Sequence, residues 1–391
     1  MKELMNSLFA GHPDHELYLG VIETVEGLVK NFPEDAWRRN MMGDEALGAE
    51  INQAINESGL MGLGVSEEHG GMGGGLTAQV LVTDLLAQHG LTSMGQVLTG
   101  FCRAPVLDYG SAEQIAKYVG PSISGEKTFC ILATEPDAGT NTFNIKTKAV
   151  NQGNGWVLNG QKVWVTNAAN ADYGFLISKT GLEQSGALSV FILDMKSEGV
   201  SFQKLDVATS GNESQYAVYF DDVTMPGDAL VGREGEGGKY MFSGLNAERL
   251  IIAALGIGFS DLALRQTTEY VTERKIFKGV PTGSYQAVQH PLARHKAETE
   301  AARLMTYTGS KMFDEGQDTG MYANMSKLLS SEAANNMADA CIQFHGGSGL
   351  DETTGMMAIW RTTRAIRIAP IANEMVLNYI AQYCIGLPRS Y

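Results

Sequence analysis

The stretch GWVLNGQKVWVTNA (155–168) decides how this chain is organised. β-Branched and aromatic residues dominate it, and Gly and Asn punctuate it, which is typical of strands separated by turns. Similar runs follow at YGFLISKT (173–180), ALSVFILDM (187–195) and QYAVYFDDVTM (215–225). Together they predict a central antiparallel β-domain over residues 123–236.

Outward from this β-domain, the sequence has a helical period on both sides. In LVTDLLAQHG (81–90) apolar residues recur at helical spacing, and Ser111 to Gln114 resemble a capped helix start. The glycine cluster GLGVSEEHGGMGGG (62–75) predicts a loop between helices. We therefore expect an α+β fold with an N-terminal helical domain (1–122) and a C-terminal helical domain (237–391).

Composition and charge exclude several classes of protein. The chain has 391 residues, of which 44% are hydrophobic and 19% charged, as in ordinary globular proteins. Its net charge of −15 argues against binding nucleic acid or anionic membranes, because both require a basic surface. A nucleotide-bearing ligand is still allowed, since a few local Arg or Lys residues can hold its phosphates.

The cysteines and the apolar segments predict where the protein works. Cys102, Cys130, Cys341 and Cys384 are scattered without metal-ligand spacing, so we expect free thiols, a reducing compartment and no metal site. No apolar run approaches membrane-spanning length, and MKELMNSLFAGHPDHELY lacks a signal-peptide core. The expectation is a soluble intracellular protein, cytoplasmic or, if eukaryotic and processed, in the mitochondrial matrix.

Five segments, in order and at fitting separations, resemble the acyl-CoA dehydrogenase family over nearly the whole chain. They are ATEPDAGTN (133–141), NGQKVWVTNAANAD (159–172), FDDVTMPGDALVGREGEGGKYMFSGLNAER (220–249), TERKIFKGVPTGSYQAVQHPLA (272–293) and QFHGGSGL (343–350).

The resemblance implies that the C-terminal domain is a four-helix bundle and that FAD lies between bundle and sheet. It also implies a homotetramer or homodimer, an acyl-CoA substrate, and an electron-transfer flavoprotein as electron acceptor. By similarity, the flavin would be lined by Ile131, Ala133, Thr134, Thr140, Trp164, Val165 and Thr166. The FAD of a neighbouring subunit would be held by Arg274, Phe277, Gln286, Gln343, Gly346 and Gly347.

These residue types suit the ligand, although each also has a simpler explanation. A pyrophosphate needs a fixed guanidinium and close backbone approach, which Arg274 and the glycine pair can provide. Flavin that accepts hydride benefits from hydrogen-bond donors around its ring. Taken alone, Trp164 could be sheet core, Arg274 a surface charge, and GGSG (346–349) a turn.

The reaction of this family requires a carboxylate that removes the α-proton of the thioester. Most members carry it near the C-terminus, where this chain has RIAPIANEMVLNYIA (367–381). Aligned on RIxxI, the catalytic position is Asn373, and an amide cannot act as a base. The Thr and Gln that usually contact the flavin there are replaced by Met375 and Leu377.

Glu248 is the predicted base, in the helical run SGLNAERLIIAALGIG (243–258). A minority branch, typified by isovaleryl-CoA and long-chain acyl-CoA dehydrogenases, places its Glu in the same L-x-x-ERL setting. Glu248 is also in register with an apolar stripe that includes Ile252 and Leu255, so its pKa should be raised. The simpler explanation is a Glu favoured in a first helical turn by the helix dipole. Glu374 is the rival base, if the C-terminal segment is shifted by one residue.

Substrate contacts follow from the same similarity. Thr140, Asn246 and Arg249 would contact the acyl-CoA, with Asn246 in place of the family's common Asp. The depth of the acyl pocket should depend on residues from Gly75 to Cys102 and on the start of the long helix. In that range, the small residues Ser93, Gly95, Thr99 and Gly100 could leave space, although loop glycines explain them equally well.

The leading hypothesis is an FAD-dependent acyl-CoA dehydrogenase that forms a 2,3-enoyl-CoA. A second keeps the flavin but changes the reaction to that of an oxidase, a monooxygenase or a desulfinase, since the segment from Asn373 to Leu377 departs from the family pattern. A third is a non-catalytic partner subunit that has lost FAD contacts.

Overall fold

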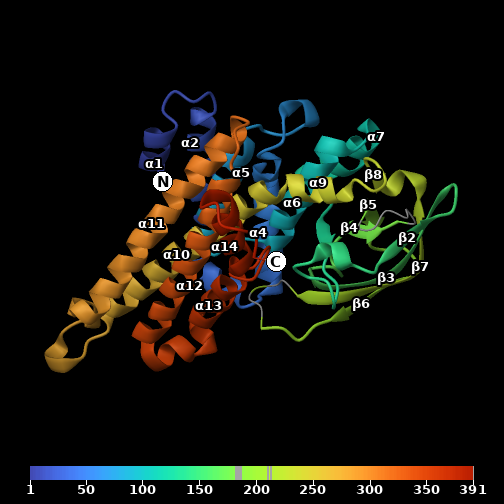
Figure 1. Ribbon diagram of the computed structural model, residues 1–391. Coiled ribbons are helices and arrows are strands. Elements are labelled where there is room, and N and C mark those ends of the chain that lie inside the picture. Colours follow the sequence, from blue (N-terminus) through green and yellow to red (C-terminus); the bar gives the residue numbers. More distant parts are fainter. Residues whose placement is uncertain (181–186, 209–210, 212–213, 391) are drawn as a thin grey trace.

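The computed structural model describes residues 1–180, 187–208, 211 and 214–390. Figure 1 shows the strands gathered at one end of the molecule and the long helices at the other, with α4 and α6 between them. The predicted α+β fold, with N-terminal helices, a central sheet and a C-terminal helical region, is confirmed.

The N-terminal region is helical, as predicted. Its capped start at Ser111 is confirmed, because the Ser111 hydroxyl accepts from Gln114 N–H and Gln114 Oε1 accepts from Ser111 N–H. The elements are α1 (Lys2–Leu8), α2 (His15–Val29), α3 (Ala36–Met41), α4 (Glu45–Glu57), η1 (Leu60–Gly62), η2 (Glu67–His69), α5 (Gly75–Gln88), α6 (Met94–Tyr109), α7 (Ala112–Gln114), η3 (Ile115–Val119) and α8 (Gly120–Ile123).

The central region is a sheet whose strands follow the four predicted runs. In the described residues the order is β6-β7-β3-β2-β4-β5-β8, and β1 also pairs with β4. Most pairs are antiparallel, as expected, but β1 and β2 pair with β4 in parallel, so the sheet is mixed. The elements are β1 (Phe129–Leu132), η4 (Thr142–Asn144), β2 (Lys148–Asn151), β3 (Gly155–Thr166), β4 (Tyr173–Lys179), β5 (Leu188–Asp194), β6 (Val200–Lys204), β7 (Gln215–Pro226), η5 (Gly227–Ala229) and β8 (Leu230–Val231).

The C-terminal region consists of long helices followed by short ones. Its elements are α9 (Gly237–Ser243), α10 (Leu245–Glu273), η6 (Phe277–Gly279), η7 (Thr282–Ser284), α11 (Gln286–Asp314), α12 (Gly320–His345), η8 (Gly346–Leu350), η9 (Glu352–Thr354), α13 (Met356–Ala365), α14 (Asn373–Tyr379) and η10 (Ile380–Cys384).

Helix α10 is the central element of the helical part, because its stretch from Leu250 to Ser260 is buried on all sides. Leu250 joins the core formed with the N-terminal helices, whereas Leu255 and Leu262 join the core formed with α12 and α13. A helix that is apolar all round is stable only when it is enclosed. Each of these buried leucines contributes about 1.5–3 kcal/mol through burial, so α10 holds both helical regions together.

The start of α5 is fixed by a residue from the far end of α11. The Asp314 carboxylate accepts hydrogen bonds from the backbone N–H groups of Leu76 (2.6 Å) and Thr77 (2.9 Å). Gly75 makes this approach possible, since its φ is +59° and a Cβ there would lie 2.3 Å from Asp314 Oδ1. The glycine cluster therefore ends in a specific helix cap.

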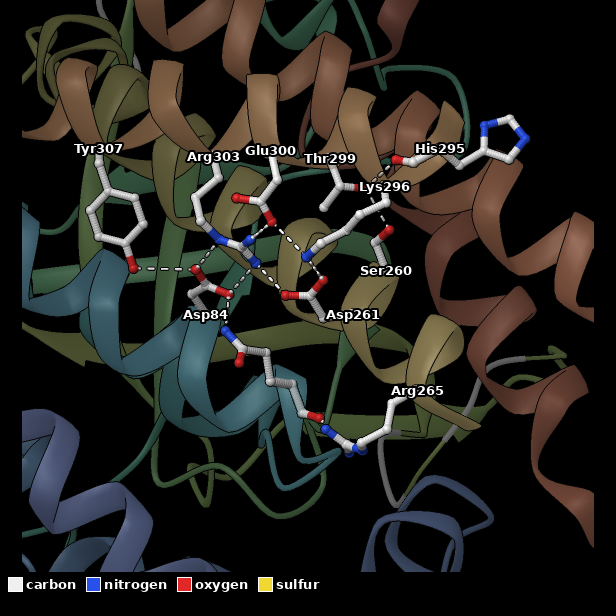
Figure 2. Close-up of polar contacts among 11 residues, drawn as sticks. Asp84, Ser260, Asp261, Arg265, His295, Lys296, Thr299, Glu300, Arg303 and Tyr307 are labelled. Carbon is white, nitrogen blue, oxygen red and sulfur yellow. Dashed lines mark hydrogen bonds and ion pairs between the residues drawn. The ribbon is translucent and has the colours of Figure 1, made fainter. Parts of the chain in front are cut away.

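A buried ionic network joins α5, α10 and α11. Figure 2 shows Asp84, Asp261 and Glu300 around the guanidinium of Arg303. Tyr307 donates to the Asp84 carboxylate (3.2 Å), as does the side-chain amide of Gln88 (2.8 Å). This network fixes the N-terminal helices against the long helices and satisfies the charges that it buries.

Two further expectations concern the cysteines and membrane spans. All four cysteines are free thiols, as predicted, and Cys102, Cys130 and Cys341 are buried. None of the described helices is long and apolar enough to cross a membrane.

Candidate active site

Glu248 lies in the first turn of α10 with its carboxylate largely removed from water. Burial raises the pKa of Glu248 to about 7, although the positive charge of the adjacent Arg249 opposes the shift. Within the described residues, the carboxylate accepts no side-chain hydrogen bond and forms no ion pair. The predicted desolvation is confirmed, and the carboxylate is still free to accept a proton.

Arg249 and Asn246 form a polar pair beside Glu248. Arg249 NH1 donates to Asn246 Oδ1 (3.0 Å), and Arg249 Nε is a buried donor without a partner in the described chain. Burial lowers the pKa of Arg249, while Glu248 and Tyr379 raise it. A buried guanidinium nitrogen without an acceptor is costly, so this position could donate to a bound ligand.

In the C-terminal segment, Asn373 and Glu374, the two residues considered for the position of the base, have opposite surroundings. Asn373 begins α14 and is 3% exposed, whereas the neighbouring Glu374 is exposed. Asn373 Oδ1 accepts from Lys327 Nζ (2.6 Å) and from the Ser331 hydroxyl (3.1 Å). Successive helical residues point about 100° apart, so Glu374 faces away from the buried position that Asn373 fills.

Lys327 explains why Asn373 is held so firmly. Its Nζ also donates to the carbonyl oxygen of Ile371 (2.6 Å), and the side chain is fully buried. Burial lowers the pKa of Lys327 to about 8, although the charge of Glu374 opposes the shift. Sequence reasoning missed this lysine, for which the signal was a lone cation among the small residues of α12.

The predicted flavin-lining residues lie on two adjacent segments, the exit of β1 and the end of β3. Trp164 is 59% exposed and has φ +58°, where the pairing of β3 with β7 shifts register between Lys162 and Val165. The bulge turns the indole out of the sheet, so Trp164 is not sheet core. The set is Ile131, Ala133, Thr134, Thr140, Trp164, Val165 and Thr166.

An ion pair that the sequence analysis missed joins these two segments. Lys162 Nζ donates to the carbonyl oxygen of Ala133 (2.9 Å) and to Glu135 Oε1 (3.0 Å), and both charged residues are buried. Glu135 also accepts from the backbone N–H of Thr147 (2.9 Å). The pair therefore holds Ala133 and Thr134 in a fixed position against β3. Both residues lie in the quoted motifs, but only the fold brings them together.

The second predicted FAD-binding set lies at the opposite end of α10. Tyr270 and His345 stack at 4.3 Å, which brings the last turn of α10 to the end of α12. Because α10 has 29 residues, its two ends are about 43 Å apart. The set consists of Arg274, Phe277, Gln286, Gln343, Gly346 and Gly347, all of them exposed. One chain cannot bring this set and Glu248 to the same flavin ring.

A cavity lies between α5 and α6, one helical turn beyond Glu248. It is a small cavity of about 70 Å³ that opens to solvent. Ile251 lines it from α10, Gly100 from α6, and Ser93 from the residue just before α6. Of the small residues singled out from the sequence, these two face the cavity. The other two face the sheet, because Thr99 Oγ1 accepts from Phe129 N–H and Gly95 lies against Asn167.

Arg103 also lines this cavity, and the sequence analysis did not single it out. The available signal was a single charged residue within the apolar run FCRAPVL (101–107).

Comparison with known proteins identifies the family. Three family models match: "Acyl-CoA dehydrogenase, N-terminal domain" over residues 20–126, "middle domain" over 130–223 and "C-terminal domain" over 235–384. The acyl-CoA dehydrogenase FadE12 of Mycobacterium tuberculosis is 35% identical over 348 residues, covering 88% of this chain and 89% of the relative. The long-chain specific mitochondrial acyl-CoA dehydrogenase of Sus scrofa is 30% identical, covering 91% and 84%.

Solved structures agree with the sequence relatives. A glutaryl-coenzyme A dehydrogenase in complex with glutaryl-CoA has a TM-score of 0.86 and 26% identity, over 96% of both chains. An FAD complex of PigA has a TM-score of 0.80 and 26% identity, over 93% of this chain and 97% of PigA. The chain therefore belongs to the acyl-CoA dehydrogenase family, whose members are oxidoreductases acting on CH–CH groups.

Proposed function

We propose that the protein is an FAD-dependent acyl-CoA dehydrogenase that converts an acyl-CoA to the 2,3-enoyl-CoA, with Glu248 as the catalytic base. The observation that carries this proposal is the desolvated carboxylate of Glu248, one helical turn before Ile251, which lines a largely apolar cavity. Its pKa of about 7 suits a group that must be ionised before the reaction and protonated after it.

The position of Glu248 suggests how the substrate is oriented. Ile251 follows Glu248 by one turn on α10 and closes the cavity, so an acyl chain in the cavity would leave its thioester end near the carboxylate. Arg249 Nε, which has no partner in the described chain, is available to a polar group of the thioester ligand. Asn246 is engaged with Arg249, so its contribution would be to orient the guanidinium.

The residues of the β1–β3 edge fit a flavin. The exposed indole of Trp164 offers a flat apolar face, and the Thr166 hydroxyl accepts from Gln215 Nε2 (2.9 Å), which leaves its own hydrogen free to donate. When bound, FAD supplies the acceptor for the β-hydride. Thr134, held by the Lys162–Glu135 pair, offers a second hydroxyl near the same edge.

The two ends of α10 support an assembly in which subunits share FAD. A side chain added at Gly346 or Gly347 would meet nothing within 4 Å, so a ligand can approach this backbone closely. Phe277, which follows the end of α10, is 79% exposed. We propose that Arg274, Phe277, Gln286, Gln343 and the glycine pair hold the FAD of a neighbouring subunit in a homotetramer or homodimer. An electron-transfer flavoprotein is the proposed electron acceptor, and the cytoplasm the proposed location.

An anaerobic titration of the purified flavoprotein with a panel of acyl-CoAs tests this function. Bleaching of the flavin absorbance by one class of chain, with a broad charge-transfer band, is the expected result. Glu248→Gln should keep the flavin and lower its rate of reduction by roughly 10²–10⁴-fold, because it removes the general base. Glu374→Gln is the matched control and should reduce as fast as the parent. Full flavin reduction in Glu248→Gln would contradict the assignment.

The altered C-terminal segment favours one alternative. Asn373 is held by Lys327 rather than facing a ligand, so the reaction could be that of an oxidase, a monooxygenase or a desulfinase. Rapid oxygen consumption without an added electron acceptor would support that alternative. A slow reaction of the reduced flavin with oxygen would support the dehydrogenase.

A further inference from the structure

Arg103 brings a positive charge to a cavity whose other walls are mainly apolar. It lies on the same face of α6 as Val97 and Gly100, and all three residues line the cavity. Leu86 and Ile251 line it from α5 and α10. Arg103 is only 4% exposed, so its guanidinium has lost most of its contact with bulk water.

The described chain provides few hydrogen-bond acceptors for the guanidinium of Arg103. Its NH1 donates to the carbonyl oxygen of Ser122 at 3.4 Å, which is a long hydrogen bond. Among the described residues, Arg103 forms no ion pair with a carboxylate. An arginine has five N–H donors, so most of them have no partner in the described chain. Burial lowers the pKa of Arg103 to about 10, which still leaves it charged at neutral pH.

A purely structural role explains Arg103 poorly. One long hydrogen bond to a backbone carbonyl does not require a charged group, and buried charges are normally paired. Arg303 shows the usual arrangement in this protein, because three carboxylates surround its guanidinium. Within the described part of the chain Arg103 has no such partners, and it lines the cavity, so its counter-charge is expected from a ligand.

We propose that the cavity binds an acyl group that carries a carboxylate, and that Arg103 is the specificity-determining residue that pairs with it. A guanidinium matches the two oxygens of a carboxylate with two parallel hydrogen bonds. The apolar walls would contact the methylene groups of the same acyl chain. This inference rests on the proposed function, which brings the thioester to Glu248 and the acyl chain into the cavity.

The test compares CoA thioesters of equal chain length that end in either a methyl or a carboxylate group. Binding is measured by calorimetry in a Glu248→Gln background, where turnover is slow, and flavin bleaching is measured in proteins that retain Glu248. Arg103→Met removes the charge and keeps an apolar side chain, and Arg103→Lys keeps the charge. Arg265→Met is the matched control, since Arg265 is another partly buried arginine bonded to one backbone carbonyl, that of Gln88, and does not line the cavity.

Parent protein should bind the best carboxylate-ended thioester at least about tenfold more tightly than its methyl-ended counterpart, as expected for a desolvated charge pair. Arg103→Met should abolish this preference without weakening methyl-ended ligands. Arg103→Lys should retain part of the preference and Arg265→Met all of it. If Arg103→Met does not fold, the inference is decided by whether the parent and Arg103→Lys prefer carboxylate-ended thioesters to methyl-ended ones.

Three results would overturn the inference, and they distinguish a wrong role for Arg103 from a wrong function. If methyl-ended thioesters bind as tightly as carboxylate-ended ones at every length and bleach the flavin, the proposed function stands and the role of Arg103 is wrong. An equal loss of both ligand types in Arg103→Met has the same meaning. If no acyl-CoA of either kind binds or bleaches the flavin, the proposed function itself fails.

Discussion

Asp84 and Glu248 are both desolvated carboxylates on helices of one core, but their surroundings are opposite. Asp84 is fully buried and accepts hydrogen bonds from Arg303, Tyr307 and Gln88 (Figure 2). Among the described residues, the positive charge of Arg249 acts to lower the pKa of Glu248, but burial outweighs it and raises this pKa to about 7. A buried carboxylate thus has a structural role where hydrogen-bond donors surround it, as at Asp84. It is a candidate base where such donors are missing among the described residues, as at Glu248.

Their neighbours respond accordingly. Although burial opposes it, the charges of Asp84 and Asp261 hold the pKa of Arg303 above its usual value. Burial and Asp84 both raise the pKa of the Tyr307 hydroxyl. Arg303 and Tyr307 therefore both keep their protons near neutral pH. Glu248 can change its state there, which a proton-transfer role requires.

The largest expected effect is on stability and comes from removing Asp84, the carboxylate whose hydrogen-bond partners are all in place. Asp84→Ala should lower the free energy of unfolding by about 3–5 kcal/mol, because it leaves the buried Arg303 without its principal partner. Urea unfolding monitored by circular dichroism measures the change. A loss below about 1 kcal/mol would mean that the network relaxes or admits water.

A second prediction follows from the raised pKa of Glu248. The rate of flavin reduction at saturating substrate should increase with pH, because only the ionised carboxylate removes a proton. With a pKa of about 7 the rate should differ roughly fiftyfold between pH 5 and pH 7. Stopped-flow absorbance across this range measures the profile. A rate that is constant from pH 5 to 8 would exclude Glu248 as the titrating base.

A third prediction uses stability rather than activity. Folding raises the pKa of Glu248 from its ordinary value to about 7. Between these two pKa values the native state binds more protons than the unfolded state. The protein therefore loses stability as the pH rises through this range. At pH 8 Glu248→Gln should therefore be about 1–2 kcal/mol more stable than the parent, after allowance for the partial exposure of the residue. The gain should shrink toward pH 5. An equal gain at both pH values would show that ionisation is not its cause.

The smallest expected effect is at the exposed edge of the Asp84 network. Glu300 contacts Arg303 and Lys296, but its side chain is 42% exposed, so water already solvates it. Glu300→Gln should change the free energy of unfolding by less than about 1 kcal/mol. Chemical unfolding of Glu300→Gln and Asp84→Ala measures both free energies of unfolding under the same conditions. Similar losses in the two variants would refute the distinction between buried and exposed members of the network.

Much of the fold followed from local patterns in the sequence. The β runs became β3, β4, β5 and β7, because their branched and aromatic residues form a sheet that is buried in part on both faces. The parallel pairing of β1 with β4 could not be foreseen, since pairing depends on how distant segments meet. The burial and raised pKa of Glu248 were also predicted from sequence, through its apolar register on one helix, and its role as the base stays a prediction.

The sequence by itself determined the family and the order of the three regions, and it predicted Glu248 rather than Glu374 as the base, because these rest on residue type and short-range spacing. Only the tertiary structure decided which partner each buried charged group meets. Lys162 meets Glu135, Lys327 meets Asn373 and Arg303 meets Asp84 across separations from 27 to 219 residues, whereas Arg103 meets no carboxylate in the described chain. The physical reason is that burial and counter-charge are properties of the assembled core, and they fix the protonation and the role of each group.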